Sequence, residues 1–455
     1  MQSVKHSSKD RISPLLDPLL YHILSFLQSK YVVQTCLLSK RWKDVWCSVP
    51  FLKLSEQLWT HKAHDDFVGF SDGLLFYRDG SNVQSFKVHC SVDLDNVNSW
   101  IIVVLRRNVE VIDIEFDCSL GFQSNVDLDK SLELTSRLYT CASLRVLKLK
   151  LGDLLLKVPN YVSLPRLEVL HIEDITFEGD GLGRLVSSCP LLQSLIIDTY
   201  IFGGHLLDIS SPQLETLILR GGVTFINISA PRLVSLEISV EGHADIKPTL
   251  SISSMGDFPY LRDANIGMEL CSATSLKKFF LAVSKAQSLK FSLEFMECFA
   301  DIIENEPLVP KWHPGQFDGL KFLDLESCFI SGNVFAIYKL LKFCPNIETF
   351  VLSNCGTNIS DDPADTKAFS ECKLYRLKLV KLKYFGGLAD EVKLVEFFIK
   401  NAENLEKLTI TTQYASLYGK VLLEMSNILL TCPRRGKLCL DNSSETPASL
   451  SFIFL

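Results

Sequence analysis

One spacing of apolar residues recurs along most of this chain: an apolar residue, two variable residues, an apolar residue, one variable residue and a final apolar residue. The copies are LRVLKL from Leu144, LEVLHI from Leu167, LQSLII from Leu192, LETLIL from Leu214, LVSLEI from Leu233, LKFLDL from Leu320, IETFVL from Ile347, LYRLKL from Leu374 and LEKLTI from Leu405. In each copy the last two apolar positions alternate with variable ones, so both side chains point to one face of an extended segment. The pattern therefore predicts a short strand in every copy, with one face buried.

Weaker copies extend the pattern toward the N-terminus and fill its middle. They are VQSFKV from Val83, VEVIDI from Val109 and LRDANI from Leu261, whereas residues 288–295 depart from the register. Successive copies begin roughly 19 to 35 residues apart, a period typical of stacked repeat proteins. Because one such unit cannot bury its apolar face alone, we expect the copies to stack into a continuous core with a parallel sheet.

The segments between the copies predict how the chain returns from one strand to the next. In GLGRLVSSCP, Leu182, Leu185 and Val186 have helical spacing. Pro190 then ends the helix before the next strand, and AIYKLLKFCP repeats this arrangement with Pro345. SPQLETL and APRLVSL instead place a short proline turn before the strand, which predicts tighter repeats.

This array resembles the leucine-rich-repeat family over roughly residues 80–410. The resemblance implies an α/β fold, in which an irregular solenoid at residues 80–366 carries a parallel sheet on its concave face. We expect a target to contact the variable strand positions of that face. These candidate target-binding residues are Lys148, Lys150, His171, Glu173, Asp198, Arg220, Glu237, Asp324 and Glu326. Their charges are mixed in sign, so they predict no particular class of ligand.

The residues before the array follow a helical pattern. Asp17 is placed to cap a helix that has Pro18 in its first turn. The apolar stripe that follows consists of Leu19, Leu20, Ile23, Leu24 and Leu27. Trp42 and Trp46 lie four residues apart and predict a further short helix. A unit of roughly 45 residues cannot bury this much apolar surface internally. We therefore expect either a partner or the repeats to cover the excess.

Residues 10–55 resemble the F-box family. The shared motif consists of Asp10, Arg11, Ile12, Ser13, Leu15, Asp17, the run ILSFL at 23–27, Val32, Val33, the run LSKRW at 38–42, and Trp46. Leu16 replaces the usual proline, and Tyr31 stands where an acidic residue is common. The resemblance implies binding to a Skp-type adaptor and, through it, to a cullin–RING ubiquitin ligase. The adaptor-binding residues carried over are Leu15, Leu16, Leu19, Ile23, Leu24, Leu27, Val32, Leu38, Trp42 and Trp46.

The two tryptophans admit a second interpretation, in which Trp42 and Trp46 clamp the helical unit onto the first repeat. We expect both interpretations to hold in part, with one tryptophan packed inward and the other bordering the adaptor. Buried aromatic anchors often contribute much of the binding energy of an interface. Residues 1–9, which precede the motif, are expected to be flexible.

The C-terminal part of the array has its own signature. Asp390 and Glu391 suit the start of a helix whose buried side includes Val395 and Phe398, and LEKLTI follows. Together with ILLTCPRRGKLCL at 428–440, this segment resembles the FBD region of plant F-box/leucine-rich-repeat proteins. We assign residues 367–441 to that region, as terminal repeats with a cap that covers the exposed core. Residues 442–455 are expected to be loosely ordered.

Composition narrows the possible functions. Hydrophobic residues make up 47% of the 455 residues and charged residues 22%, as in an ordinary folded protein. A net charge of −7 argues against nucleic acid as a partner, which would require a basic surface. No apolar run approaches the roughly 20 residues of a membrane span, and no secretory signal is recognisable. The 14 cysteines form no CxxC pair, so we expect reduced thiols and a location in the nucleus or cytoplasm.

The sequence gives no support to an enzyme. It contains none of the phosphate-binding, dinucleotide-binding, nucleophile-elbow or metalloprotease motifs. His61 and His64 could ligate a metal, but a solvated loop fits better because further ligands are missing. We therefore expect no cofactor and no metal. The preferred hypothesis is a non-catalytic substrate receptor of an SCF-type (Skp–cullin–F-box) ubiquitin ligase. The alternative is a binding scaffold or ligand sensor that acts without ubiquitin transfer.

Overall fold

The structure is a computed structural model of the chain. It describes residues 12, 14–59, 64–91, 94–116, 133–199, 206–221, 225–239, 249–270, 273–305, 317–327, 331–354, 372–387, 389–412, 423, 426, 428, 436–441 and 449–454. The flexible terminus predicted at residues 1–9 lies outside these ranges. The chain divides into two compact units, Met1–Thr199 and Tyr200–Leu455.

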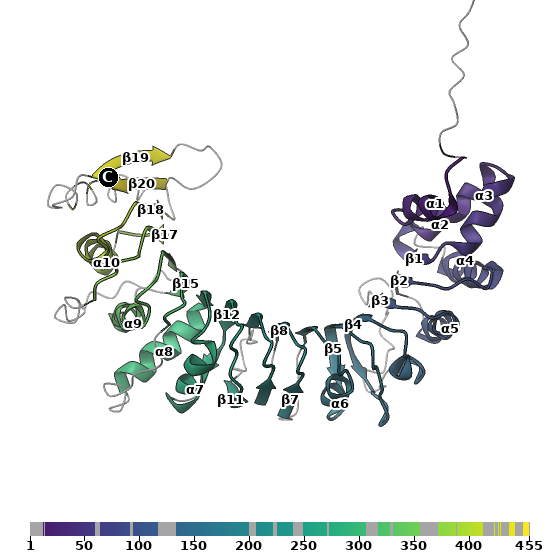
Figure 1. Cartoon of the computed structure of the whole chain (residues 1–455), viewed down its shortest axis with the longest axis horizontal. Coiled ribbons are helices and arrows are strands. Elements are labelled where there is room, and N and C mark those ends of the chain that lie inside the picture. The colour runs from purple at the N-terminus through teal and green to yellow at the C-terminus, as the bar shows by residue number, and fades with distance from the viewer. Residues whose placement is uncertain are drawn as a thin grey trace, which may run out of the picture. The chain divides into compact units, whose positions relative to one another are not determined.

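The first unit begins with short helices and continues as a parallel sheet. Its elements are α1 (Asp17–Leu24), α2 (Ser29–Gln34), η1 (Thr35–Leu37), α3 (Lys40–Val45), η2 (Trp46–Ser48), β1 (Phe51–Ser55), η3 (Glu56–Leu58), α4 (His64–Tyr77), β2 (Ser85–Cys90), α5 (Leu94–Leu105), β3 (Val111–Phe116), η5 (Leu138–Thr140), β4 (Val146–Leu156), β5 (Val169–Phe177), α6 (Gly181–Ser187) and β6 (Ser194–Asp198). The strands β1 to β6 pair in chain order, and α4, α5 and α6 lie along one face of the sheet (Figure 1). Because β1 pairs with β2, the sheet starts within residues 10–55, which the sequence assigned to the helical unit.

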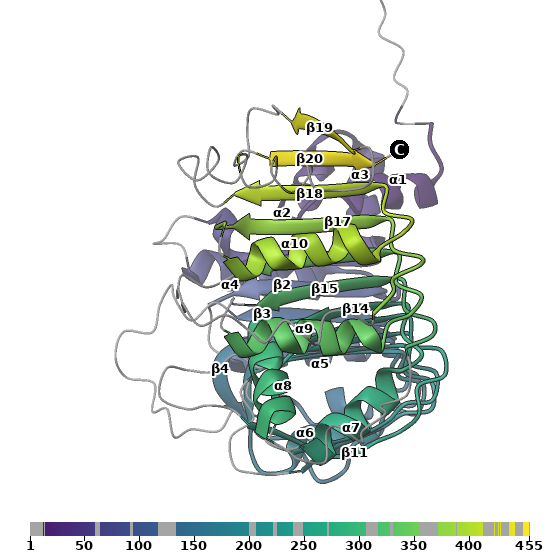
Figure 2. The same ribbon diagram turned by 90° about the vertical axis from the view of Figure 1, so that its left-hand side faces the viewer.

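The second unit contains β7 (Leu206–Ser210), β8 (Thr216–Arg220), β9 (Phe225–Ser229), β10 (Ser235–Ser239), β11 (Thr249–Met255), β12 (Asp263–Gly267), β13 (Glu269–Leu270), α7 (Ala273–Val283), β14 (Ser288–Phe291), α8 (Leu293–Asn305), β15 (Phe322–Ser327), α9 (Ser331–Lys342), β16 (Thr349–Asn354), β17 (Leu379–Phe385), α10 (Ala389–Asn401), β18 (Lys407–Thr412), β19 (Gly436–Asp441) and β20 (Ser449–Phe454). Its larger sheet has the order β8-β10-β12-β14-β15-β16-β17-β18-β20-β19. α9 and α10 lie against this sheet, with their axes along the strands (Figure 2).

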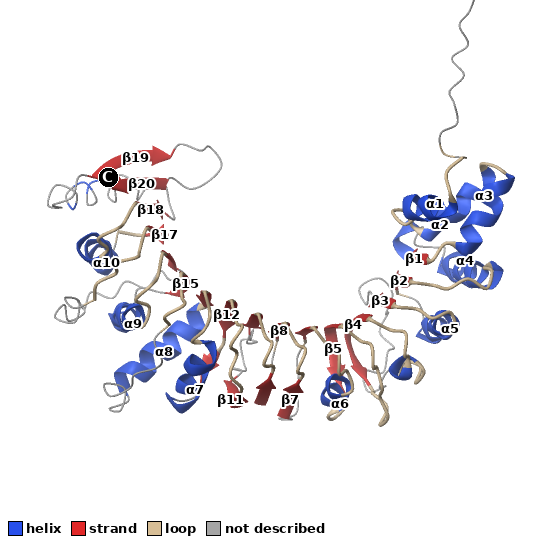
Figure 3. Ribbon diagram, in the orientation of Figure 1, coloured by secondary structure: helices blue, strands red, loops and turns tan. Residues whose placement is uncertain are grey.

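A second, four-stranded sheet forms where the proline turns make the repeats tight. β13, β11, β9 and β7 pair side by side in this order. They occupy the place that helices take in the other repeats (Figure 3). Ile226 and Ile228 of β9 are buried while Ser229 is exposed, and this alternation is the period of a strand. The sequence predicted the tight turns but not this sheet.

The predicted inward positions form the core. Leu147 and Leu149 of β4 and Leu170 and Ile172 of β5 are all essentially inaccessible to solvent. Residues such as Leu147 and Leu170 occupy paired positions on these two adjacent parallel strands. Each strand thus contributes one inward row to a continuous apolar layer, which explains why one repeat could not fold alone.

A ladder of backbone hydrogen bonds keeps the repeats in register just before each strand. The amide of Glu110 donates to the carbonyl of Gln84 at 3.1 Å, and Arg145 donates to Glu110 at 2.8 Å. Glu168 then donates to Arg145, and Gln193 to Glu168, both at 2.8 Å. The side chains of neighbouring rungs also pair, since Arg145 Nη2 lies 2.8 Å from Glu168 Oε2.

Two predicted copies need correction. In LYRLKL the inward residues are Val380 and Leu382, which pair with Phe350 and Leu352 of β16, so that copy begins at Leu377. The segment at 288–295, predicted to depart from the register, contains β14, which pairs in register with β12 and β15. Buried Ala286 there occupies the first apolar position in place of a leucine.

The end of the chain is more ordered than expected. Within residues 442–455, predicted to be loose, β20 pairs antiparallel with both β18 and β19. This strand covers the edge that β18 would otherwise expose, and β19 follows it as the last strand of the sheet. Before it, α10 begins as predicted, and the fully buried Glu391 accepts a hydrogen bond from the amide of Gly386 at 2.9 Å.

Candidate functional site

The helical unit at the N-terminus has a small core of its own. The buried residues of this core are Leu20, Leu24, Val32, Trp42, Val45 and Val49, with Leu15, Tyr21, Trp46 and Phe51 packed against them. Leu20 and Leu24 are four residues apart and therefore share the inward face of α1. This corrects three of the predicted adaptor contacts, because Leu24, Val32 and Trp42 are at most 5% exposed. These three residues support the unit and are not available to a partner.

Other large apolar side chains of the unit remain in solvent. We call these residues the N-terminal apolar surface: Ile12, Leu16, Leu19, Ile23, Phe26, Leu27, Tyr31, Leu37 and Leu38. Leu16 is 73% exposed and Leu37 is 85% exposed. Leu16, Leu19 and Ile23 lie on one helical face, three to four residues apart. An exposed apolar patch of this kind marks an interaction site in soluble proteins.

This surface includes five of the predicted adaptor contacts and four exposed apolar residues that the prediction did not name. The five are Leu16, Leu19, Ile23, Leu27 and Leu38, and the four are Ile12, Phe26, Tyr31 and Leu37. Leu15 and Trp46 are half-buried against the core. Trp42 packs inward and Trp46 remains partly exposed, while the expected contact of one tryptophan with the adaptor stays a prediction. Phe26 and Leu37 fall outside the α-helical stripes, so helical periodicity could not find them.

One arginine holds the start of α1 against α3. Arg41 Nη2 donates to the carbonyl oxygen of Leu15 at 2.6 Å and to the Asp17 carboxylate. Asp17 is therefore not the helix cap that the sequence suggested, because Leu16 occupies the N-cap position and makes no side-chain cap bond. The two bonds tie α3, which contains Arg41, to the start of α1.

The helical unit is fastened to the first repeat by polar contacts. Lys30 of α2 donates through Nζ to the carbonyl oxygen of Leu58, beyond β1, at 3.0 Å. Arg78, directly after α4, donates through Nη1 to the carbonyl oxygen of Val49 at 2.6 Å. Burial lowers the pKa of Arg78 to about 10, so its guanidinium stays charged at neutral pH. These contacts use a different part of the unit and leave the N-terminal apolar surface uncovered.

The target-binding candidates of the first unit come together on the open face of its sheet. Lys148 faces His171 across β4 and β5, and Lys150 faces Glu173 in the next level. Asp198 of β6 stands beside Glu173. Lys150 pairs with Glu173, and His171 Nε2 lies 3.5 Å from a Glu173 oxygen. Lys148, Lys150, His171 and Glu173 line part of a shallow depression of about 210 Å³. Burial lowers the pKa of His171, which favours its neutral form.

The candidates of the second unit form two separate groups. Arg220 Nε lies 2.8 Å from Glu237 Oε1. Asp324 and Glu326 lie on β15, with β12 and β14 between them and the first pair. Glu326 pairs with Lys290 at 2.9 Å. Burial raises the pKa of Asp324, whose Oδ1 accepts no hydrogen bond within the described part of the chain. The four candidates of the second unit therefore do not make one site.

Among the residues that the structure describes, no group of three or more His, Cys, Asp or Glu side chains is arranged to hold a metal ion. His61 lies outside the described residues, so the possible pair with His64 has no structural account. No helix in the described part of the chain has the length and apolar character needed to span a membrane.

Relatives of this chain occur in Arabidopsis thaliana. Putative F-box/FBD/LRR-repeat protein At2g05300 is 28% identical over 95% of this chain and 97% of the relative. F-box/LRR-repeat protein 13 is 28% identical over 88% and 89%, and FBD-associated F-box protein At5g56380 is 27% identical over 94% and 99%. In each comparison the similarity thus extends over most of this chain and most of the relative.

Three family models match successive parts of the chain. The F-box domain matches residues 12–54, the LRR repeats described for FBD-associated F-box protein At5g56370 match residues 97–261, and FBD matches residues 369–410. The chain therefore carries an F-box, an LRR region and an FBD region, in the order that the names of its plant F-box/FBD/LRR-repeat relatives describe. The N-terminal apolar surface is therefore a surface of the F-box, and the open sheet faces belong to the repeats and the FBD region.

Proposed function

We propose that this F-box/FBD/LRR-repeat protein is a substrate-recognition subunit of an SCF-type ubiquitin ligase. Its F-box would bind a Skp-type adaptor, and its repeats would hold a target protein. The observation that carries the proposal is the N-terminal apolar surface, which the chain leaves exposed although it folds a complete core beneath it. Covering apolar surface stabilises a complex by about 25 cal/mol per Å² before the costs of association are subtracted.

The arrangement suits a rigid connection between adaptor and target. The F-box is fastened to the first repeat by Lys30 and Arg78, each through a hydrogen bond to a backbone carbonyl on the other side of the boundary. A target on the repeats would then be held at a fixed distance from the adaptor. Such tethering raises the effective concentration of a target lysine to about the millimolar range. The chain itself contributes no chemical group to ubiquitin transfer in this proposal, and it would act inside the cell.

The repeats would recognise a target through their open faces. Most charges there already have a partner in the chain, such as Lys150 with Glu173 or Arg220 with Glu237. A target must therefore compete with these ion pairs or bind beside them. We expect the repeats to select a target by the shape of its surface more than by its net charge. The shallow depression around Lys148 and His171 is too small for a folded domain and suits single side chains of a target.

The test measures binding of a purified Skp-type adaptor to the full chain by calorimetry. The double variant Leu19→Asp, Leu38→Asp places carboxylates at exposed positions of the N-terminal apolar surface. We expect the affinity to fall by about 100-fold or more, because interface anchors contribute roughly 2–4 kcal/mol each. The thermal midpoint should stay close to that of the wild type, because neither side chain is buried.

The matched control is Tyr161→Asp, which introduces the same charge at an exposed residue outside this surface. It should leave adaptor binding unchanged. An adaptor that does not bind the wild type, or binds the double variant equally well, would contradict the proposal. Substitutions at Leu24 or Trp42 are unsuitable here, because they would test the fold of the F-box instead of its binding surface.

A further inference from the structure

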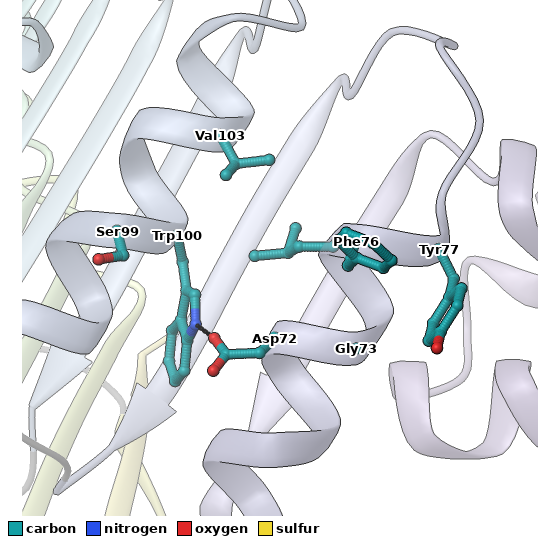
Figure 4. Close-up of a pocket in the computed structure, with 8 residues that line it drawn as sticks. Asp72, Gly73, Phe76, Tyr77, Ser99, Trp100 and Val103 are labelled. Atoms are coloured by element: carbon teal, nitrogen blue, oxygen red, sulfur yellow. Dashed lines mark hydrogen bonds between the residues drawn. The ribbon is translucent and has the colours of Figure 1, made fainter.

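A cavity of about 620 Å³ lies between α4 and α5, on the helical side of the first repeats. Leu75 and Trp100 are the buried residues of its lining, whereas Phe76 is largely exposed. Trp100 Nε1 donates to Asp72 Oδ1 at 2.7 Å. Figure 4 shows this bond at one end of the cavity and Val103 projecting from α5 toward α4. The cavity is separate from the F-box surface and from the open sheet faces discussed above.

The rim of the cavity carries aromatic side chains that are not buried in the core. Phe76 is 80% exposed and Tyr77 is 69% exposed. Their rings meet edge to face with centroids 5.1 Å apart. Beside them, a Cβ added to Gly73 would have no heavy atom within 4 Å. The absence of a side chain at Gly73 keeps the groove open, although glycine weakens a helix.

The carboxylates of α4 and α5 give both helices a negative charge. α4 contains Asp65, Asp66 and Asp72, α5 contains Asp95, and neither helix contains a lysine or an arginine. Helix-dipole interactions account for Asp65, Asp66 and Asp95, which lie in first turns. Asp72 lies within α4, is exposed and lines the cavity. Arg78 and Arg107, which follow the helices, donate to the carbonyl oxygens of Val49 and Asp79. Arg106 at the end of α5 is exposed.

From this geometry we propose that the groove between α4 and α5 is a docking site for an apolar, basic polypeptide segment. A large apolar side chain of the segment enters the cavity over Leu75 and Trp100, where Gly73 leaves room. Flanking lysine or arginine side chains face Asp72 and the acidic first turns of the helices. This site goes beyond the proposed adaptor and target contacts, since it uses neither the F-box surface nor the open sheet face.

The test uses an amphipathic helical peptide of leucine and lysine as the probe, and a matched peptide of leucine and glutamate as its control. Binding is measured with the full chain in the Leu19→Asp, Leu38→Asp background, so that the F-box surface does not compete for the peptide. The groove is then filled by Gly73→Leu. The matched variant Gly69→Leu makes the same change on the same helix, where a Cβ also has open space but Gly69 is not part of the lining of this cavity.

We expect the leucine–lysine peptide to bind in the micromolar range and Gly73→Leu to weaken it at least tenfold. Gly69→Leu should change the affinity less than twofold, and both variants should keep or raise the thermal midpoint. Three results would each overturn the proposal: no binding to the starting protein, equal weakening by both variants, or equal affinity for the leucine–glutamate peptide. Unfolding of Gly73→Leu would also overturn it, because the open space at that position would then not exist.

Discussion

The F-box surface and the open face of the repeats expose side chains of opposite character. On the F-box, leucines such as Leu16 and Leu37 stand in solvent with no apolar partner on their outer side. On the sheet of the first unit, Lys150 and Glu173 are half-buried and pair with each other. The comparison teaches that exposed apolar area reveals a binding site more clearly than charge, because charges on a sheet can satisfy one another.

The same comparison separates two functions that a leucine can have within one helix. Leu20 and Leu24 of α1 are buried, while Leu19 and Ile23 of the same helix are exposed. Only the buried pair should matter to the isolated chain, and only the exposed pair should matter to a partner. The experiments below test this separation, in order of decreasing effect.

The largest effect is expected for Trp42→Ala. Trp42 lies in the F-box core, and removal of a buried aromatic side chain costs about 3–5 kcal/mol. The free energy of unfolding of the first unit, measured by denaturant titration with hydrogen exchange of residues 14–59, should fall by this amount. Adaptor binding should fall with it. If stability were unchanged, the assignment of Trp42 to the core would be wrong.

A smaller effect is expected for Phe26→Ala and Leu37→Ala. Both side chains are exposed, so the free energy of unfolding should change by less than about 0.5 kcal/mol. Adaptor affinity should nevertheless fall by about 10- to 100-fold for each, because both belong to the proposed contact surface. Calorimetry with the purified adaptor measures the loss. Unchanged affinity for both variants would remove these residues from the interface.

A modest gain in stability is expected for Asp324→Asn. Burial raises the pKa of Asp324, so the folded state binds this proton more tightly than the unfolded state. The stabilising contribution of the proton is therefore present at low pH and is lost as the pH rises through the raised pKa. At pH 7 the variant should be more stable by up to about 1 kcal/mol, after discounting for partial exposure.

The advantage of Asp324→Asn should shrink as the pH falls toward 3.8, the ordinary pKa of the carboxyl group. Thermal unfolding of both proteins at several pH values measures this difference. A variant that is less stable at pH 7 would show that Asp324 is stabilised by its lysine neighbours more than it is penalised by burial.

The smallest effect is expected for Lys150→Ala. The lysine pairs with Glu173 and lies 3.5 Å from Asp174. The side-chain hydrogen bond with Glu173 raises the pKa of Lys150, but solvent still reaches the pair. Exposed ion pairs contribute about 0–1 kcal/mol, so the thermal midpoint should hardly change. A large loss of stability would show that charges on the open face support the sheet, and would weaken the contrast with the F-box.

Much of the fold follows from the spacing of apolar residues, and the failures have physical reasons. Near β17, residues 374–382 fit two overlapping copies of the pattern, one that begins at Leu374 and one that begins at Leu377. Only the pairing of this strand with Phe350 and Leu352 selects the second copy, in which Val380 and Leu382 point inward. The four-stranded sheet was missed because a short alternating segment next to a turn gains its stability from neighbouring strands.

The sequence predicted only part of the candidate site, because periodicity alone does not say which apolar side chains face the core. A five-residue apolar stripe at residues 19–27 shows that the helix has a wide apolar face, but it does not distinguish the inward part of that face from the outward part. The packing of Trp42 against Leu20 and Leu24 makes that distinction. Phe26 and Leu37 lie at the ends of short helical turns, where neither a helical nor a strand period indicates the direction of a side chain.

The most direct test of the central claim is side-chain footprinting of the full chain with and without a Skp-type adaptor. Photochemical labelling of exposed side chains, read by mass spectrometry, reports on Leu19, Phe26 and Leu37 individually. Our account predicts that labelling of these residues falls strongly in the complex, while labelling of Tyr161 is unchanged. Binding of the adaptor without protection of these residues would contradict the claim that the N-terminal apolar surface is its docking site.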